Sequence, residues 1–291
     1  MLLLSGDGGI VDILNGLLTG PARTTLYRSP TLGVVAMGTG NALAYSIGLS
    51  RDRTLGLRRF YRGTTHPLPT FTATFSPGSA LLVDEGSARS PLPTNAHGLG
   101  VVHGAVVCSW ALHASIVADS DTIEYRRHGN ARFRMAAQEL LRPADGTAAH
   151  EYKGRVSYTP PGGDGLSRES KESGSLHSYV LATLVSHLEP GFHISPASQP
   201  LDGQLRLLRM GAPITAEAME AVLGKAFTDG SHVDDPAVEY ESVSRVRIDV
   251  EEVEERWRRV CVDGKIVVVP EGGWVEIQMN PVGESVLNIV A

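Results

Sequence analysis

Two glycine-rich turns, each lying between an apolar stretch and a helical pattern, constrain the fold of this chain more than any other feature. The first turn is S-G-D-G at residues 5–8; it follows apolar residues 1–4 and precedes apolar side chains at helical spacing from Ile10 to Leu17. The second is G-T-G-N at residues 38–41, between the apolar stretch 31–37 and a helix predicted from Ala42 to about Gly48. Strand, glycine turn and helix, occurring twice, predict an α/β fold with a parallel sheet.

The pattern changes near Tyr61 to that of a mostly β domain. Strands are predicted at 70–75, 80–83 (pairing with 70–75), 101–110, 179–184, 204–210, 243–249, 258–262, 266–269 and 274–278. Helices are predicted at 124–141 and 215–227, and a mobile loop at 160–175; the first helix is expected to end at Gly20-Pro21. We therefore expect an incomplete Rossmann-like α/β nucleotide domain over residues 1–65 and a larger β-sandwich domain over residues 66–291.

Charge and cysteine content limit the classes of function. The formal net charge of −6 gives the 291-residue chain no overall positive field for nucleic acid, so a contact with an anionic membrane would have to be local. The two cysteines, Cys108 and Cys261, exclude a disulfide framework and favour a reducing compartment. No apolar run reaches the ~18–20 residues needed to cross a bilayer. These properties predict a cytoplasmic protein that does not bind nucleic acid.

The residue types in both turns suit polyphosphate binding. Glycines leave backbone N–H groups free and let the chain approach a phosphate without a Cβ in the way. Beside polyphosphate, an acid such as Asp7 would be repelled unless it held Mg²⁺ or took a proton from the attacking hydroxyl. Taken alone, Asp7 could equally cap a helix. The recurrence of the turn in an equivalent context favours function.

The stretch S-G-D-G-G-I-V-D-I-L-N-G-L at residues 5–17, followed by M-G-T-G-N-A-L-A at residues 37–44, resembles the paired signature of diacylglycerol kinase and sphingosine kinase catalytic domains. Asp12 stands where the family has Glu. The resemblance implies an ATP- and Mg²⁺-dependent lipid kinase with Asp7 as the general base for the lipid hydroxyl. It also implies a nucleotide site lined by Ser5, Gly6, Gly8, Asp12, Gly38, Thr39, Gly40 and Asn41.

A third stretch, A-D-S-D at residues 118–121 followed by Y-R-R-H-G at 125–129, is similar to a segment of sphingosine kinases. This similarity implies that Asp121, with Asp119, contacts the polar head of the lipid and that Arg126 and Arg132 serve the nucleotide phosphates. A carboxylate can pair with a sphingoid ammonium, and guanidinium matches phosphate oxygens. Without the glycine turns, a solvated helix start would explain these residues equally well. The stretch favours a sphingoid base over diacylglycerol as substrate.

Asp263-Gly264, between apolar residues 260–262 and 266–269, predicts a hairpin with a type I′ turn. The family carries D-G-E here, with the acid near the nucleotide, but this chain has Lys265 in place of the Glu. By resemblance Asp263 and Gly264 belong to the nucleotide site, while a role in the turn alone stays open. Another Asp-Gly pair, Asp202-Gly203, resembles a family segment that we interpret as structural.

The short stretch before the first glycine turn leaves the activity open. Little chain precedes the first glycine turn, so we expect an N-terminally truncated form of the family's nucleotide domain, and a non-catalytic lipid- or nucleotide-binding homologue is an alternative. A soluble NAD kinase is a weaker enzymatic alternative.

The histidines fit no metal-ligand spacing. R-W-R-R at 256–259 could touch a membrane surface, although one exposed strand face would explain it too.

Overall fold

The computed structural model describes residues 1–19, 29–49, 53–162, 168–169 and 175–291. The predicted helix end at Gly20-Pro21 and most of the predicted mobile loop, residues 163–167 and 170–174, lie outside the described residues. Within the predicted loop, β10 (Arg168–Glu169) pairs with β9 (Tyr152–Thr159).

The N-terminal part is the predicted α/β unit. Strand β1 (Leu2–Ser5) pairs in parallel with β2 (Thr31–Ala36), and α1 (Asp7–Thr19) connects them on the way from the first glycine turn. The helices α2 (Ala42–Ser46) and α3 (Leu57–Arg62) follow the second turn. The alternation of strand, turn and helix read from residues 1–48 is therefore confirmed.

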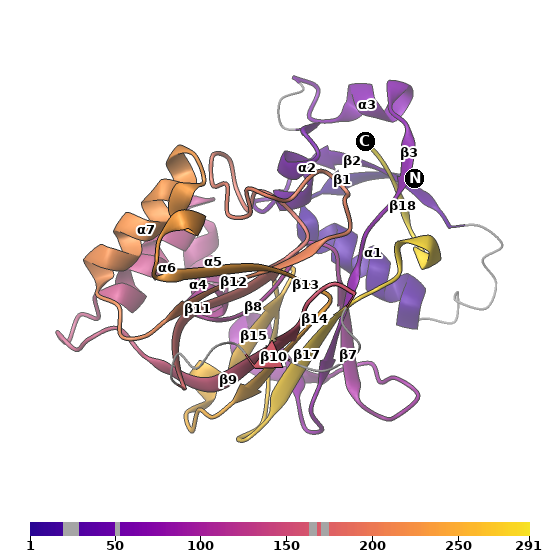
Figure 1. Cartoon of the computed structure of the whole chain (residues 1–291). Helices are drawn as coiled ribbons and strands as arrows, with labels where there is room; N and C mark the ends of the chain where they lie inside the picture. Colours follow the sequence, from indigo (N-terminus) through magenta and orange to yellow (C-terminus); the bar gives the residue numbers. More distant parts are fainter. Residues whose placement is uncertain (20–28, 50–52, 163–167, 170–174) are drawn as a thin grey trace.

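This first sheet is completed by the end of the chain. Strand β18 (Asn288–Val290) pairs in parallel with β2 and antiparallel with β3 (Thr65–Pro67), so the strand order is β1-β2-β18-β3. The two chain ends accordingly lie on the same side of the molecule (Figure 1). The last three strand residues of the β part thus belong to the sheet of the α/β part.

The rest of the chain forms the expected large antiparallel β domain. Its main path of paired strands runs β6-β5-β16-β15-β8-β11-β9-β14-β17-β4-β7, with β12 and β13 extending from β11. The strands not yet bounded are β4 (Phe71–Phe75), β5 (Ala80–Val83), β6 (Ala88–Pro91), β7 (Gly100–Gly104), β8 (Val107–Ala111), β11 (Leu176–Thr183), β12 (Leu205–Gly211), β13 (Val238–Val243), β14 (Arg245–Val250), β15 (Arg259–Val262), β16 (Lys265–Val268) and β17 (Trp274–Met279). Four helices lie together at one end of this domain (Figure 1): α4 (Leu112–Asp119), α5 (Ile123–Arg126), α6 (Ala131–Leu141) and α7 (Ala216–Thr228).

Two expectations for the β domain were wrong in detail, and some of its strands were not expected. The helix expected over 124–141 is interrupted after α5, where Gly129 takes a left-handed backbone conformation (φ 55°). Strand β5 pairs with β6 and β16 rather than with β4, because a neighbouring strand in sequence need not be a neighbour in the sheet. The strands β6, β9 and β13 were not predicted from the sequence; the central residues of β13 are polar and partly exposed and so show no apolar alternation.

One side chain fixes α1 against the β domain. The Asn15 amide donates from Nδ2 to the carbonyl of His103 at 2.8 Å, and its Oδ1 accepts the N–H of His103 at 2.9 Å. Asn15 therefore pairs with strand β7 as a neighbouring strand residue would. This contact sets where the first glycine turn faces the β domain.

Candidate active site

The two glycine turns pack directly against each other. A Cβ built on Gly6 would lie 2.0 Å from the carbonyl oxygen of Gly40, and one built on Gly38 would lie 2.4 Å from the Cα of Gly6. The N–H of Asp7 donates to the same Gly40 carbonyl at 3.0 Å. Because real Cβ atoms do not approach backbone atoms so closely, glycine at positions 6 and 38 is required by this contact.

Close packing does not require glycine at position 8. Gly8 is exposed, and a Cβ at this position would meet nothing within 4 Å. It lies in the first turn of α1, where N–H groups have no intrahelical acceptor. Within the described part of the chain, no acceptor is recorded for the N–H groups of Gly8, Thr39 or Gly40. Open amides at a helix N-terminus fit an anionic ligand such as polyphosphate.

The Asp7 carboxylate joins the two turns. It accepts the N–H of Ala42 at 2.7 Å and that of Leu43 at 3.1 Å, so it caps α2 rather than its own helix. Burial raises the pKa of Asp7, while the hydrogen bonds from these two amides lower it. Two amides leave part of the carboxylate's acceptor capacity unused. A carboxylate with a raised pKa and a free lone pair can take a proton from a hydroxyl.

Asn41, expected to line the nucleotide site, uses its side chain inside the second turn. Its Oδ1 accepts the N–H of Gly38 at 3.1 Å, and its Nδ2 donates to the Gly38 carbonyl at 2.5 Å. The residue is only 6% exposed. The amide therefore holds the turn closed, which leaves Thr39, at the exposed tip, as the turn's accessible side chain.

The Asp263-Gly264 hairpin turn is of the predicted kind. Val262 pairs with Lys265, and both loop residues have positive φ, 48° and 88°, as a type I′ turn requires. The Asp263 carboxylate is buried and accepts the N–H groups of Ala105 at 2.6 Å, Val106 at 3.1 Å and Val107 at 2.7 Å.

Asp263 also lies close enough to Asp7 for the two charges to interact. Burial, together with the smaller effect of the nearby Asp7 charge, raises the pKa of Asp263 to about 7 against the opposing effect of the amide hydrogen bonds. The structure thus brings together two carboxylates that are far apart in sequence. It does not bring Asp263 to the surface, where a nucleotide could reach it.

Lys265, the departure from the family motif, pairs with Asp12. Its Nζ lies 2.6 Å from Asp12 Oδ1, and the pair bridges the hairpin to α1. The two residues that differ from the family pattern are therefore in contact with each other. Lys265 thus supplies a positive charge near the carboxylates of Asp7, Asp12 and Asp263.

The residues expected to bind the lipid head and the phosphates form a separate network. Asp121 pairs with Arg126 at 3.0 Å and with Arg132 at 3.3 Å. Asp119 pairs with Arg256 at 2.9 Å and with Arg259 at 2.7 Å. Each predicted substrate-binding acid therefore faces two guanidinium groups, and sequence reasoning missed the pair from residues 256–259.

The β15–β16 hairpin connects this network with the glycine turns. Asp263 at its tip feels the charge of Asp7, while Asp121 contributes to the raised pKa of the buried Cys261 thiol, which burial mainly causes. Cys261 and Asp263 are two residues apart on one strand end.

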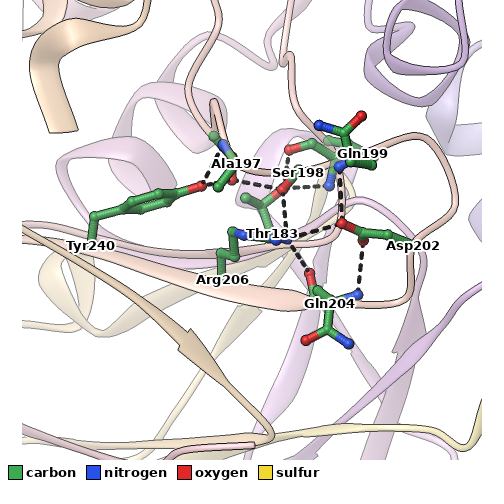
Figure 2. A network of polar contacts seen from close by, with 10 residues as sticks. Thr183, Ala197, Ser198, Gln199, Asp202, Gln204, Arg206 and Tyr240 are labelled. Carbon is green, nitrogen blue, oxygen red and sulfur yellow. Dashed lines mark hydrogen bonds and ion pairs between the residues drawn. The ribbon is translucent and has the colours of Figure 1, made fainter.

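The remaining Asp-Gly pair is structural, as interpreted from the sequence (Figure 2). Asp202 accepts the N–H groups of Gln199 and Gln204, each at 2.9 Å, and pairs with Arg206 at 3.2 Å. Arg206 also donates to Ser198 Oγ at 3.3 Å. Every one of these contacts stays within the 198–206 loop and strand end, so Asp202 fixes that loop.

An apolar cavity of about 370 Å³ lies among α4, α6, α7 and the edge of the β domain. It is lined by Leu112, Leu140, Leu141, Ala148, Ala149, His150, Glu151, Tyr152, Ser178, Pro213, Ile214, Thr215, Ala216 and Met219. This cavity could not be predicted from the sequence, because its walls come from segments whose apolar residues are equally typical of ordinary core packing.

Two features are absent from the described ranges. In them, no helix is both long and apolar enough to cross a bilayer. Nor do three or more His, Cys, Asp or Glu side chains converge there as a metal site would require.

Comparison with protein families matches residues 1–73 to the diacylglycerol kinase catalytic domain. Human sphingosine kinase 2 is 26% identical over 169 residues, which is 55% of this chain and 21% of that protein. Sphingosine kinase 1 of Arabidopsis thaliana is 26% identical over 167 residues, 56% of this chain and 28% of that protein. The matches thus span less than a third of the length of these relatives. The resemblance to the diacylglycerol and sphingosine kinase superfamily is confirmed.

Solved structures agree on the fold. A Bacillus anthracis protein assigned as a diacylglycerol kinase superposes with a TM-score of 0.60 at 15% identity, covering 99% of this chain and 77% of that one. A second structure from the same organism, with the same assignment, gives a TM-score of 0.59 at 14% identity and covers 76% of that chain. At such identities the likeness shows the fold.

Proposed function

We propose that this chain, whose first 73 residues match the diacylglycerol kinase catalytic domain, transfers the γ-phosphoryl group of ATP to the primary hydroxyl of a sphingoid base. Membership in a lipid kinase family is supported by the comparisons; the substrate, the residue roles and a peripheral location at membranes belong to the proposal. One observation carries it. Asp7 lies between two packed glycine turns whose outer amides, at Gly8, Thr39 and Gly40, are open to an anion.

In the proposed reaction Asp7 takes the proton of the lipid hydroxyl while that oxygen attacks the γ-phosphorus. The bond from the γ-phosphorus to the bridging oxygen breaks, and ADP leaves with the electron pair. The open amides hold the polyphosphate, and positioning and charge stabilisation supply most of the catalysis in phosphoryl transfer. General-base action is typically worth ~10²–10⁴ in rate.

Mg²⁺ suits this arrangement although the described residues contain no cluster of three acids. The ion usually keeps several waters and takes one or two carboxylates together with the substrate phosphates. Asp7, partly exposed at the glycine turns, and the Asp12 carboxylate on the next turn of α1 are the acids at hand. When bound, Mg²⁺ would neutralise charge on the phosphate oxygens.

The position of the apolar cavity supports a lipid substrate. Strand β8 begins at Val107, whose N–H binds Asp263 beside the glycine turns, and ends just before Leu112, which lines the cavity. Those five residues span roughly 17 Å of extended chain. The cavity thus lies about one strand length from the glycine turns, a separation that a long hydrocarbon tail can bridge. Because every residue of β8 is buried, such a tail would pass outside this strand.

Diacylglycerol is the second candidate substrate, and the acid–arginine network favours it. Each of the two carboxylates, Asp119 and Asp121, is already paired with two guanidinium groups. A sphingoid ammonium would have to displace these arginines before it could pair with either acid. A neutral diacylglycerol head meets no such penalty.

The test is transfer of labelled phosphate from Mg-ATP to sphingosine, phytosphingosine, ceramide and diacylglycerol, with Asp7→Asn as the control. Label on one lipid that is lost in the control supports the kinase and names its substrate. If a folded chain labels none of the four, the proposed activity is wrong and a non-catalytic lipid- or nucleotide-binding role takes its place.

A further inference from the structure

Residues 53–62 form an exposed segment in which arginines alternate with large apolar side chains. The segment contains four arginines and no Asp or Glu. Leu55 is 45% exposed, Leu57 41%, Phe60 36% and Tyr61 79%. None of the residues of α3, which makes up most of the segment, is buried. Exposed apolar side chains gathered in one short segment mark an interaction surface.

The segment is held on the N-terminal sheet by its backbone and one ring. The carbonyl of Leu55 accepts the N–H of Ala36 at 3.1 Å, and the Phe60 ring lies over Gly33 of β2, where a Cβ would come within 2.2 Å of it. These contacts hold α3 against β2 while Leu57 and Tyr61 stay exposed. In Figure 1, α3 projects at the outer end of the N-terminal part, away from α6 and α7.

Among the described residues, none forms an ion pair with the four arginines of the segment. Arg53, Arg58, Arg59 and Arg62 are all exposed. The R-W-R-R stretch at 256–259 is the opposite case. Arg256 and Arg259 there are bound to Asp119, and the Trp257 ring stacks on His150 at 4.1 Å between centroids. The stretch considered from sequence for membrane contact is thus engaged inside the molecule.

We infer that residues 53–62 dock the protein on an anionic lipid surface. The guanidinium groups would contact lipid phosphates, and Leu55, Leu57 and Tyr61 would enter the interface between headgroups and acyl chains. This inference rests on the proposed lipid kinase function in one respect: a lipid substrate resides in a membrane, which gives the protein a reason to dock there. Charge complementarity identifies the partner, because the chain as a whole carries −6 and this segment carries +4.

Aliphatic side chains favour a membrane over nucleic acid. Nucleic-acid surfaces use cations for phosphates and aromatic rings for bases, and give exposed leucines no partner. At a bilayer interface, by contrast, leucine, tyrosine and arginine all contribute. The leucines therefore provide the substitutions that separate the two partners.

The experiment is co-sedimentation of the whole chain with vesicles, without ATP or substrate, so its outcome does not depend on kinase activity. The probes are vesicles of phosphatidylcholine alone and of phosphatidylcholine mixed with phosphatidylserine. The variants are Arg58→Gln with Arg59→Gln, and Leu57→Ser with Tyr61→Ser. The control, Arg134→Gln with Arg155→Gln, removes the same charge from exposed positions outside the segment.

We expect the wild type and the control to bind the anionic vesicles and not the neutral ones, with either segment variant at least tenfold weaker. Three results would overturn the inference: no binding by the wild type, equal binding by all variants, or loss of binding to a single-stranded RNA probe without loss on vesicles. Phosphate transfer to lipid in neutral detergent micelles, measured in parallel, tells a failed kinase from a failed docking surface. All substitutions are at exposed positions, and thermal unfolding checks that each variant is folded.

Discussion

Two Asp-Gly pairs meet at the centre of this molecule, and they show how the same dipeptide serves different purposes. Asp7 and Asp263 both accept backbone N–H groups of a distant segment. Asp7 receives two, is partly exposed and lies beside open amides; Asp263 receives three and is 5% exposed. The partner glycines differ as well, since Gly264 needs its positive φ of 88° and Gly8 does not. We interpret the first pair as chemical and the second as architectural.

The sharpest test of the comparison is Asp7→Asn. We expect phosphate transfer to fall by about 10²–10⁴, because an amide cannot accept the hydroxyl proton. The remaining oxygen can still accept one of the two α2 amides, so the free energy of unfolding should fall by only about 1 kcal/mol. Steady-state rates and urea unfolding of the same preparation measure both. Wild-type activity in this variant would end the assignment of Asp7 as base.

For Asp263→Asn we expect the reverse. An Asn NH₂ group would face the donors at residues 105–107, leaving buried amides unpaired, and the free energy of unfolding should drop by roughly 2–4 kcal/mol. Where the variant is folded, at low temperature, its catalytic rate should stay within a few-fold of the wild type. A stable Asp263→Asn protein with no activity would instead place this carboxylate in the chemistry.

The pH dependence of stability should follow Asp263. Its pKa is raised from an ordinary 3.8 to about 7 in the folded state, so the folded protein holds a proton that the unfolded chain releases. The stability from this group is complete below pH 3.8 and is lost as the pH rises to about 7, by an amount on the order of a few kcal/mol. Urea midpoints across this range measure it. An unchanged slope in Asp263→Asn would assign the dependence to other groups.

The two glycines give the smallest effects and a direct contrast. Gly264→Ala forces alanine into a left-handed conformation and should cost about 1–2 kcal/mol. Gly8→Ala adds a methyl group in open space within a helix and should stabilise the protein by about 0.5–1 kcal/mol. If polyphosphate lies on the amide of Gly8, the same alanine weakens ATP binding, measured by calorimetry. An unchanged ATP affinity in Gly8→Ala would show that the phosphates do not bind at this turn.

Local patterns in the sequence predicted the elements that carry the site but not their neighbours. The glycine turns, α1 and the type I′ hairpin were all evident, because each is specified by residues adjacent in sequence. The partners of β5, the break before α6 and the polar strand β13 were not. Each of these depends on contacts with distant strands, which override local preference.

The sequence by itself therefore determined that two strand–turn–helix units precede a β domain and that their turns carry the residues of a lipid kinase signature. Only the tertiary structure decided that Asp7 caps α2 and that Asp263 accepts backbone amides 156–158 residues away. The ion pair between Lys265 and Asp12 likewise depends on the tertiary structure. It alone showed that Arg256 and Arg259 are paired with Asp119, whereas no ion pair with a described residue holds the arginines of 53–62. The physical reason is that a turn or helix is stabilised by residues near it in sequence. The partner of a charged side chain, by contrast, depends on which distant segments pack beside it in the folded protein.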